Sequence, residues 1–341
     1  MVERSVTEET EKPKQFVVAP MVTSNPAFGN GAGLVGIYFF RPDPEDTVSP
    51  ASTVSVIGMY SDTESYLAGV FAQAFLDHDQ LRATGGVVTG RINNEYNVTG
   101  FPEEIDFSNQ LIGFLGRVDK RIKGDFFLGV RSSYMINQYN AGNAASHDYF
   151  EAYNVEDGHY AKVGLIASHD TRDNVRYPTE GHEAQLSFTI APDWLGAKES
   201  YHVTEAYWNQ YQSITSDQVL ALRIYGRFTP ADTPYSGLST IGQLSDLRGF
   251  TSGEVLAENL IAAQAEYRYF FTERFGAVVF AGVSELYDGG ISNFNSDTFY
   301  ASGGVGARIV LSQENKMNFR VDIAWGSREQ RGFYVSVGEA F

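Results

Sequence analysis

The sequence predicts an all-β fold: a transmembrane antiparallel up-and-down β-barrel of 16 strands, with one long external loop folded into its lumen. Apolar and polar residues alternate with a period of two through nearly all of 15–341. Most alternating segments are about 10 to 15 residues long, which suits tilted strands that cross a bilayer. Long and short connections also alternate along the chain. We expect 15–341 to be a single barrel domain and 1–14, which is charged and lacks an apolar period, to be a disordered tail.

The expected strands follow from this alternation. They lie at 15–23, 31–40, 51–60, 65–76, 81–91, 107–119, 124–139, 158–169, 181–191, 199–214, 217–229, 259–271, 274–286, 297–311, 316–326 and 332–341. In 316–326 the apolar residues fall on one face and the charged residues on the other. Small and charged residues toward the lumen, with aliphatic and aromatic residues toward lipid, are typical of a membrane barrel rather than of a soluble sandwich.

The connections indicate which end of the barrel faces the periplasm. The long ones, such as 140–157 and 230–258, follow odd-numbered strands, whereas most even-numbered strands end in tight turns. The connections 41–50 and 170–180 are longer exceptions on the side of the tight turns. An even number of strands places both termini in the periplasm. We interpret Phe341, at the end of the last expected strand, as the C-terminal signal for membrane insertion.

Composition and charge exclude several classes of protein. The net charge of −17 argues against nucleic acid as a partner, because phosphate binding requires a basic surface. The longest apolar runs, such as 275–283, are about half as long as a membrane-spanning helix. We expect no cofactor and no metal. If the protein is exported to the bacterial outer membrane, its signal peptide has been removed, and outer-membrane lipid and lipopolysaccharide surround it.

The loop 243–258 contains the segment on which the functional prediction depends. Leu247, Arg248, Gly249 and Phe250 place one cation among apolar residues in an otherwise polar, glycine-containing stretch. In a loop that docks, an aromatic side chain fills a gap, Gly permits close backbone approach, and Arg makes a fixed contact with a carboxylate. The alternative at this point is an ordinary long loop that contains the tripeptide by chance.

Four segments, in the expected order, resemble the BamA/TamA superfamily of outer-membrane assembly factors and two-partner secretion barrels, also called the bacterial surface antigen family. They are the loop segment 247–250, the turn with Asp170, Arg172, Asp173, Pro178 and Gly181, the strand segment 265–268 with Glu266, and the last strand, 335–341, with Gly338 and Phe341. A weaker match lies at 24–33. The resemblance covers nearly all of 15–341. It implies a loop folded into the lumen and a seam between the first and last strands that acts as a lateral gate.

Two features depart from the pattern of the family. Its members normally carry N-terminal periplasmic POTRA domains, whereas about fourteen residues precede the first expected strand here. Either those domains were trimmed from the chain, or it belongs to a short branch that lacks them. In addition, Gly282 stands where the family has an Asp that helps to hold the loop Arg.

We expect Arg248 to reach the inner wall and pair with Glu266, which the alternation places in the lumen. Such a charge-assisted contact contributes about 1.5–3 kcal/mol. Asp322 is the preferred substitute for the missing Asp, because Glu285 falls on the opposite face. Whether Arg248 only makes the barrel rigid or takes part in a movement stays open.

Two other places carry weaker expectations. Gly338 weakens strand pairing and lets the last strand kink inward, so the seam is either a lateral gate or a fully closed pairing in which Gly338 merely faces the lumen. We interpret Asp170, Arg172, Asp173, Pro178 and Gly181 as a structural turn, since these residue types form and fix chain reversals.

The leading functional hypothesis is insertion or transport of protein or lipid at the outer membrane, with a separate periplasmic partner or client and no enzyme activity. The first alternative is a passive pore or structural barrel. The remote alternative is a hydrolase that uses either His147 with Asp148 and Glu151, or a dyad of His169 and Asp170. No G-x-S-x-G motif supports hydrolysis. The sequence leaves formation of homo-oligomers open.

Overall fold

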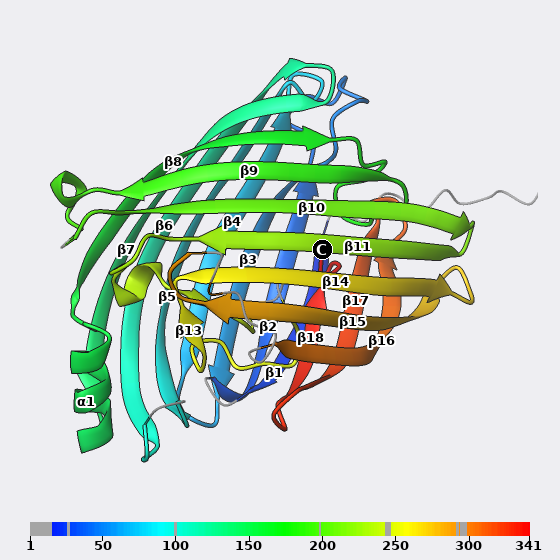
Figure 1. Cartoon of the computed structure of the whole chain (residues 1–341). Helices are drawn as coiled ribbons and strands as arrows, with labels where there is room; N and C mark the ends of the chain where they lie inside the picture. Colours follow the sequence, from blue (N-terminus) through cyan, green and yellow to red (C-terminus); the bar gives the residue numbers. More distant parts are fainter. Residues whose placement is uncertain are drawn as a thin grey trace, which may run out of the picture.

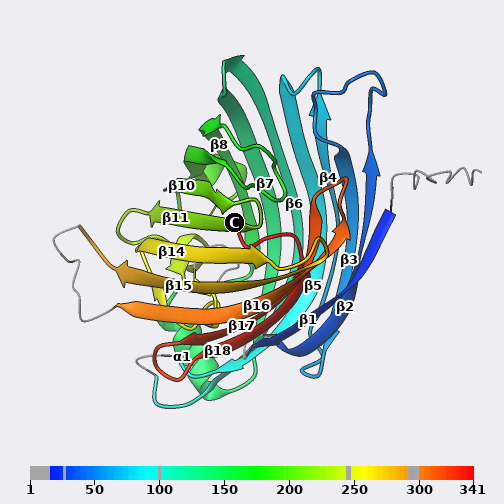
Figure 2. The same cartoon turned by 90° about the vertical axis from the view of Figure 1, so that its right-hand side faces the viewer.

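The computed structural model describes residues 16–25, 28–98, 101–197, 199–242, 247–290, 293 and 299–341. It is a closed antiparallel barrel of sixteen strands (Figures 1 and 2), so the predicted fold class is confirmed. The expected tail 1–14 lies outside the described residues. Among the described residues, no helix is long and apolar enough to span a membrane.

The barrel strands are β1 (Phe16–Asn25), β2 (Gly29–Phe40), β3 (Ser52–Ser61), β4 (Tyr66–Leu76), β5 (Leu81–Tyr96), β6 (Ile105–Lys123), β7 (Phe126–Ala141), β8 (Gly158–Asp170), β9 (Gly181–Ala191), β10 (Tyr201–Thr215), β11 (Gln218–Phe228), β14 (Asn259–Phe270), β15 (Phe275–Tyr287), β16 (Tyr300–Ser312), β17 (Met317–Gly326) and β18 (Arg331–Val337). The connections contain the helix α1 (Ala144–Ala152), the short 3₁₀ turns η1 (Asp193–Leu195) and η2 (Tyr235–Gly237), and the paired segments β12 (Ser239–Thr240) and β13 (Leu256–Ala257). Each barrel strand pairs with its neighbours in sequence, β11 pairs with β14, and β1 pairs with β18 to close the barrel.

The two faces of the wall have the inverted polarity of a membrane barrel. Leu165 on β8 and Val279 on β15 point outward, with exposed fractions of 66% and 56%. Charged side chains such as Arg268, Arg308 and Asp322 are 0% exposed and lie on the inner face. Apolar groups meet lipid on the outside, whereas charged groups inside pair with one another and with the folded-in loop.

The last strand is shorter than predicted. We expected 332–341 to be one strand that ends in Phe341, but β18 ends at Val337 and the next residue, Gly338, has a φ of 87°. That left-handed backbone conformation suits glycine and ends the strand. The tail 339–341 turns into the lumen, where Arg268 Nη2 donates to the main-chain oxygen of Phe341 at 2.8 Å. Both views place the C-terminal end within the barrel (Figures 1 and 2), so the prediction that the last strand continues to Phe341 is wrong.

Candidate functional site

The loop between β11 and β14 folds into the lumen and packs against the wall. Leu247, Arg248 and Phe250 are 0%, 1% and 5% exposed. The ring of Phe250 packs edge-on against Tyr300 of β16, with their centroids 5.7 Å apart. Gly249 has a φ of 100°, and a Cβ there would lie 3.2 Å from the Cβ of Ala324 on β17. The loop therefore needs glycine both for its backbone conformation and for its close approach to the wall.

Arg248 makes one ion pair with each of two strands. Its Nη2 lies 2.7 Å from Glu266 Oε2 on β14, and its Nη1 lies 2.8 Å from Asp322 Oδ2 on β17. The guanidinium also covers the ring of Phe280 on β15, at 3.5 Å from the centroid. Both carboxylates are 0% exposed at their side chains. We call Arg248, Glu266 and Asp322 the loop lock.

The loop lock continues into the C-terminal tail through two further arginines. Arg268 Nε lies 2.7 Å from Glu266 Oε1, and Arg308 Nη1 lies 2.6 Å from Asp322 Oδ1. Arg308 Nε in turn lies 2.7 Å from Glu339 Oε2, beyond the end of β18. Buried charges are tolerated only when they are paired in this way. One ion-pair network therefore joins the loop, the wall and the tail.

The loop also contacts the last strand directly. The main-chain N–H of Gly249 donates to the hydroxyl oxygen of Tyr334 on β18 at 3.0 Å. Gln330, just before β18, donates through Nε2 to Glu254 Oε1 at 2.8 Å. The folded-in loop thus rests on the strand that forms one side of the barrel seam.

The departure at Gly282 has a steric explanation. A Cβ at Gly282 would lie 2.7 Å from Leu247 Cδ1 and 2.8 Å from Gln264 Cγ. The space for a side chain at this position is therefore taken by Leu247 of the loop. The second carboxylate at Arg248 comes from Asp322 and not from Glu285.

We predict that Gly282→Ala lowers the free energy of unfolding by about 1–3 kcal/mol, the typical cost of an extra methyl group in a packed site. The physical reason is the overlap with Leu247, which the loop must relieve by moving. Urea titration of the folded barrel in detergent measures the change. Gly116→Ala is the matched control, because its Cβ would meet no atom closer than 3.5 Å. Equal stability of the two variants would contradict the close packing of the loop.

The seam between β1 and β18 is short. Its register has three consecutive pairs near the end of β1: Val22 with Val335, Thr23 with Tyr334 and Ser24 with Phe333. On its other side β1 forms ten pairs with β2. Among the described residues, 16–21 of β1 have no strand partner on the seam side.

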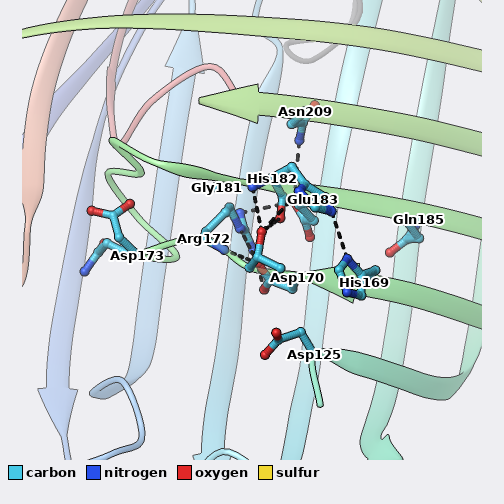
Figure 3. Close-up of polar contacts among 12 residues, drawn as sticks. Asp125, His169, Asp170, Arg172, Asp173, Gly181, His182, Glu183, Gln185 and Asn209 are labelled. Carbon is cyan, nitrogen blue, oxygen red and sulfur yellow. Dashed lines mark hydrogen bonds and ion pairs between the residues drawn. The ribbon is translucent and has the colours of Figure 1, made fainter. Parts of the chain in front are cut away.

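The structural turn connects β8 to β9, and its polar side chains contact one another (Figure 3). Arg172 Nε lies 2.8 Å from Asp170 Oδ1, and its Nη1 lies 3.1 Å from Glu183 Oε2. Although burial acts to lower it, the pKa of Arg172 is raised overall by Asp170 and Glu183, so the guanidinium stays charged. Asp173 accepts from the main-chain N–H of Thr179 at 2.8 Å.

The rest of the turn reaches toward the ion-pair network. Gly181 has a φ of 89°, and a Cβ there would lie 2.2 Å from the main-chain oxygen of Thr171. The main-chain oxygen of Pro178 accepts from Arg268 Nη1 at 3.5 Å. The turn residues singled out in the sequence therefore lie together, and Pro178 contacts an arginine that also binds Glu266.

The His169–Asp170 dyad is not formed. Adjacent residues of a strand point to opposite faces, so Asp170 faces Arg172 in the lumen while His169 Nδ1 lies 2.8 Å from His182 Nε2 (Figure 3). The other hydrolase candidates, His147, Asp148 and Glu151, are exposed on α1. Among the described residues, no group of three or more His, Cys, Asp or Glu side chains is placed to hold a metal ion.

Sequence reasoning missed Arg308, Glu339 and Tyr334. The alternation of β16 puts Arg308 on the inner face, which was a usable signal. The contact of Glu339 with Arg308 was not predicted, because the residues after Gly338 continue the alternation of the expected strand 332–341. No local pattern indicates that the hydroxyl of Tyr334 meets the backbone of a loop 85 residues away.

Known structures share this architecture at low sequence identity. BamA from Haemophilus ducreyi lacking POTRA domains 1–3 aligns with a TM-score of 0.58 and 11% identity, over 95% of this chain and 70% of that one. CdiB from Acinetobacter baumannii gives a TM-score of 0.62 and 10% identity, over 95% of this chain and 59% of that one. CdiB from Escherichia coli gives 0.61 and 9%, over 94% and 62%. These likenesses concern the fold.

The family of the chain is identified from its sequence. A search of curated proteins finds no match. The family model for the Omp85 superfamily domain, however, matches residues 53–341, which include the docked loop, the turn after β8 and the last strand. With its sixteen-stranded barrel and its lumenal loop, the chain belongs to the Omp85 superfamily.

Proposed function

We propose that this barrel inserts or transports protein or lipid at the bacterial outer membrane, with the seam between β1 and β18 as a lateral gate. The observation that carries the proposal is the short seam, in which three pairs join β1 to β18 while ten join β1 to β2. An incompletely paired strand edge is a template for adding another strand. The similarity to BamA and CdiB barrels supports the same class of function.

The unpaired edge has room for an incoming strand because the tail leaves it. Val22 pairs with Val335, so continuing this register would put Gly338 opposite Ala19 and Phe341 opposite Phe16. Instead, Gly338 turns the tail inward and Glu339 pairs with Arg308. We propose that the tail and a client strand are alternatives for the same edge of β1.

The ion-pair network supplies a link between the loop and this gate. Arg308 contacts Asp322 of the loop lock and Glu339 of the tail. A change in the position of Arg248 therefore alters the charges that hold the tail. The proposal assigns the barrel no catalytic role, and it requires a separate periplasmic partner to deliver the client.

A disulfide across the seam tests the gate. In Val22→Cys/Val335→Cys the two residues pair directly, and the chain has no native Cys to interfere. We expect oxidation to stop insertion of an unfolded barrel client into liposomes that hold this protein, and reduction to restore it. The matched control is Tyr38→Cys/Val54→Cys, which joins the ordinary neighbours β2 and β3.

Equal activity of the oxidised seam variant and the oxidised control would overturn the gate. Loss of activity in both would indicate a general effect of rigidity and would overturn it as well. Planar-bilayer conductance addresses the passive pore: the proposal expects a mainly closed barrel, because the loop and tail are folded into the lumen. A large and permanently open channel would favour the passive pore.

A further inference from the structure

A groove lies on the outer face of the wall formed by β4 to β9. Its volume is about 850 Å³, within the roughly 300–1,000 Å³ typical of small-molecule sites. Its floor consists of small residues on four neighbouring strands, which pair directly in the order Ala72, Gly85, Gly116 and Ser132. Directly paired residues share one face of a sheet. Val130, two residues before Ser132 on β7, also lines the groove and is 56% exposed, so this face is the one that meets lipid.

Larger apolar side chains border the floor. The next row of directly paired residues, which also lines the groove, consists of Val118, Val130, Leu165 and Phe188. Above the floor the space is open, since a Cβ at Gly85 would meet no atom of the described residues closer than 3.8 Å. The groove is therefore a depression in the lipid-facing surface, with small residues at its base and large apolar residues beside them.

The two arginines that border the groove turn their charges away from it. Arg117 Nε lies 2.6 Å from Asp119 Oδ2, and Arg131 Nη1 lies 2.9 Å from Glu205 Oε2. Neighbours in a strand point to opposite faces, so these side chains extend into the lumen while the residues on either side of them face outward. The groove itself is uncharged and suits hydrocarbon.

The groove rises into the wall from the rim that carries the tight turns. Its end on β4 and β5 lies at Ala74 and Ala83, each two residues from the strand end next to the turn 77–80. Its other end lies at Phe188, seven residues from the end of β9 at Gly181. A strand advances about 3.3 Å per residue, so this second end is much deeper in the bilayer. An acyl chain that starts at one membrane surface follows the same course.

A lysine lies beside the rim end of the groove. Lys120 pairs directly with Leu81 of β5 and Leu128 of β7 and therefore shares their face of the wall. Leu128 is 55% exposed, and Lys120 is exposed as well. Among the described residues, the ammonium of Lys120 has no ion pair and no hydrogen bond. A lysine on the lipid side extends along the apolar surface toward the headgroups, where its charge stays hydrated or meets an anion.

We propose that the groove binds one anionic phospholipid, with an acyl chain along the floor and the phosphate at Lys120. An apolar groove without hydrocarbon in it leaves its lining short of van der Waals partners, and an ammonium at the headgroup level attracts an anionic lipid. A phospholipid supplies both groups in one molecule. The site is separated from the seam by β2 and β3, and it shares with the proposed function only the location of the barrel in a bilayer.

Native mass spectrometry of the full chain in detergent tests the headgroup end of the site. The probe is palmitoyl-oleoyl phosphatidylglycerol, and phosphatidylcholine with the same chains is the comparison. We expect one retained phosphatidylglycerol per barrel and a preference for it of about fivefold, since a lysine near the headgroups contributes about 1 kcal/mol. Lys120→Gln is expected to abolish the preference. Lys316→Gln is the matched control, because Lys316 is exposed in the turn before β17, outside the groove.

Gly85→Leu tests the groove itself. Its side chain would occupy the place of the acyl chain, and we expect about tenfold weaker retention of both lipids, which corresponds to about 1.4 kcal/mol of overlap. Gly58→Leu is the matched control, since Gly58 is exposed on β3, lies outside the groove and would place its Cβ with no atom of the described residues within 4 Å. Apolar residues suit the lipid-facing surface, so both variants are expected to fold, as heat-dependent migration on gels verifies.

The proposal fails if the unmodified chain retains the two lipids equally, or if Lys120→Gln keeps the preference for phosphatidylglycerol. Unchanged retention in Gly85→Leu would place the lipid elsewhere on the barrel and overturn the proposal as well. Equal loss in Gly85→Leu and Gly58→Leu would indicate unspecific surrounding lipid, with the same consequence. A dimer of the chain that Gly85→Leu dissociates would assign the groove to a second copy instead of a lipid.

Discussion

Removing the charge of Arg248 is expected to lower the free energy of unfolding by about 3–5 kcal/mol, the range for removing one partner of a buried ion pair. Arg248 is 1% exposed at its side chain and contacts Glu266 and Asp322, which are both 0% exposed. Arg248→Met keeps much of the side-chain volume but takes one cation away from two buried carboxylates. Urea unfolding in detergent, followed by tryptophan fluorescence, measures the difference.

Two further variants separate the ion pairs from the packing of this side chain. Arg248→Lys keeps the charge but lacks the fork that reaches two carboxylates, so an intermediate loss is expected. Arg131→Met removes a lumenal cation that pairs with Glu205 and is 35% exposed, and it is expected to cost about 1 kcal/mol or less. If Arg248→Met costs no more than Arg131→Met, the loop lock does not stabilise the barrel.

Reversing the charge of Glu339 is expected to release the tail from the lumen. Glu339 accepts from Arg308 Nε and from Asn318 Nδ2, both at 2.7 Å. In Glu339→Lys a cation would face Arg308 and Arg268 at close range, and this repulsion opposes the folded-in position. A cysteine introduced at Ala340 reports the change, since the chain has no other Cys. We expect its reaction with a water-soluble thiol reagent to be about tenfold faster or more, because tenfold corresponds to about 1.4 kcal/mol of lost docking free energy.

The neutral variant Glu339→Gln is the control for this experiment. It keeps an oxygen that accepts from Arg308 or Asn318 but loses the charge, so a smaller increase in rate is expected. Thiol reactivity that is the same in Glu339→Lys and in the unmodified tail would show that Glu339 does not hold the tail inside. That outcome would contradict the proposed link between the loop lock and the seam.

The strand pattern was predictable because the barrel wall imposes it residue by residue. The period of two places Glu266 and Asp322 on the inner face and Glu285 away from Arg248, and Asp322 is the second carboxylate that contacts Arg248. The alternation did not decide the His169–Asp170 dyad, because the expected strand 158–169 ends at His169 and leaves Asp170 in the turn. The structure extends β8 to Asp170, and neighbours in a strand cannot share a face.

The remaining features depend on contacts between distant segments. Gly282 is explained by Leu247, which belongs to a loop 35 residues earlier in the chain, and no local pattern reports the overlap of their side chains. The end of β18 depends on a positive φ at Gly338 and on Arg308 as the partner of Glu339. A glycine within an alternating segment is compatible with both a continued strand and a turn. The tertiary contacts decide between them.

Site-specific photo-crosslinking during client insertion tests the central claim, that the free edge of β1 receives the client. A photo-reactive residue replaces Val18, which lies on that edge and is 54% exposed, or Val130 on β7, which is 56% exposed on a wall strand paired along both sides. The account predicts that an inserting barrel client crosslinks to position 18 and not to position 130. Equal crosslinking at both positions, or none at position 18 while insertion proceeds, would contradict it.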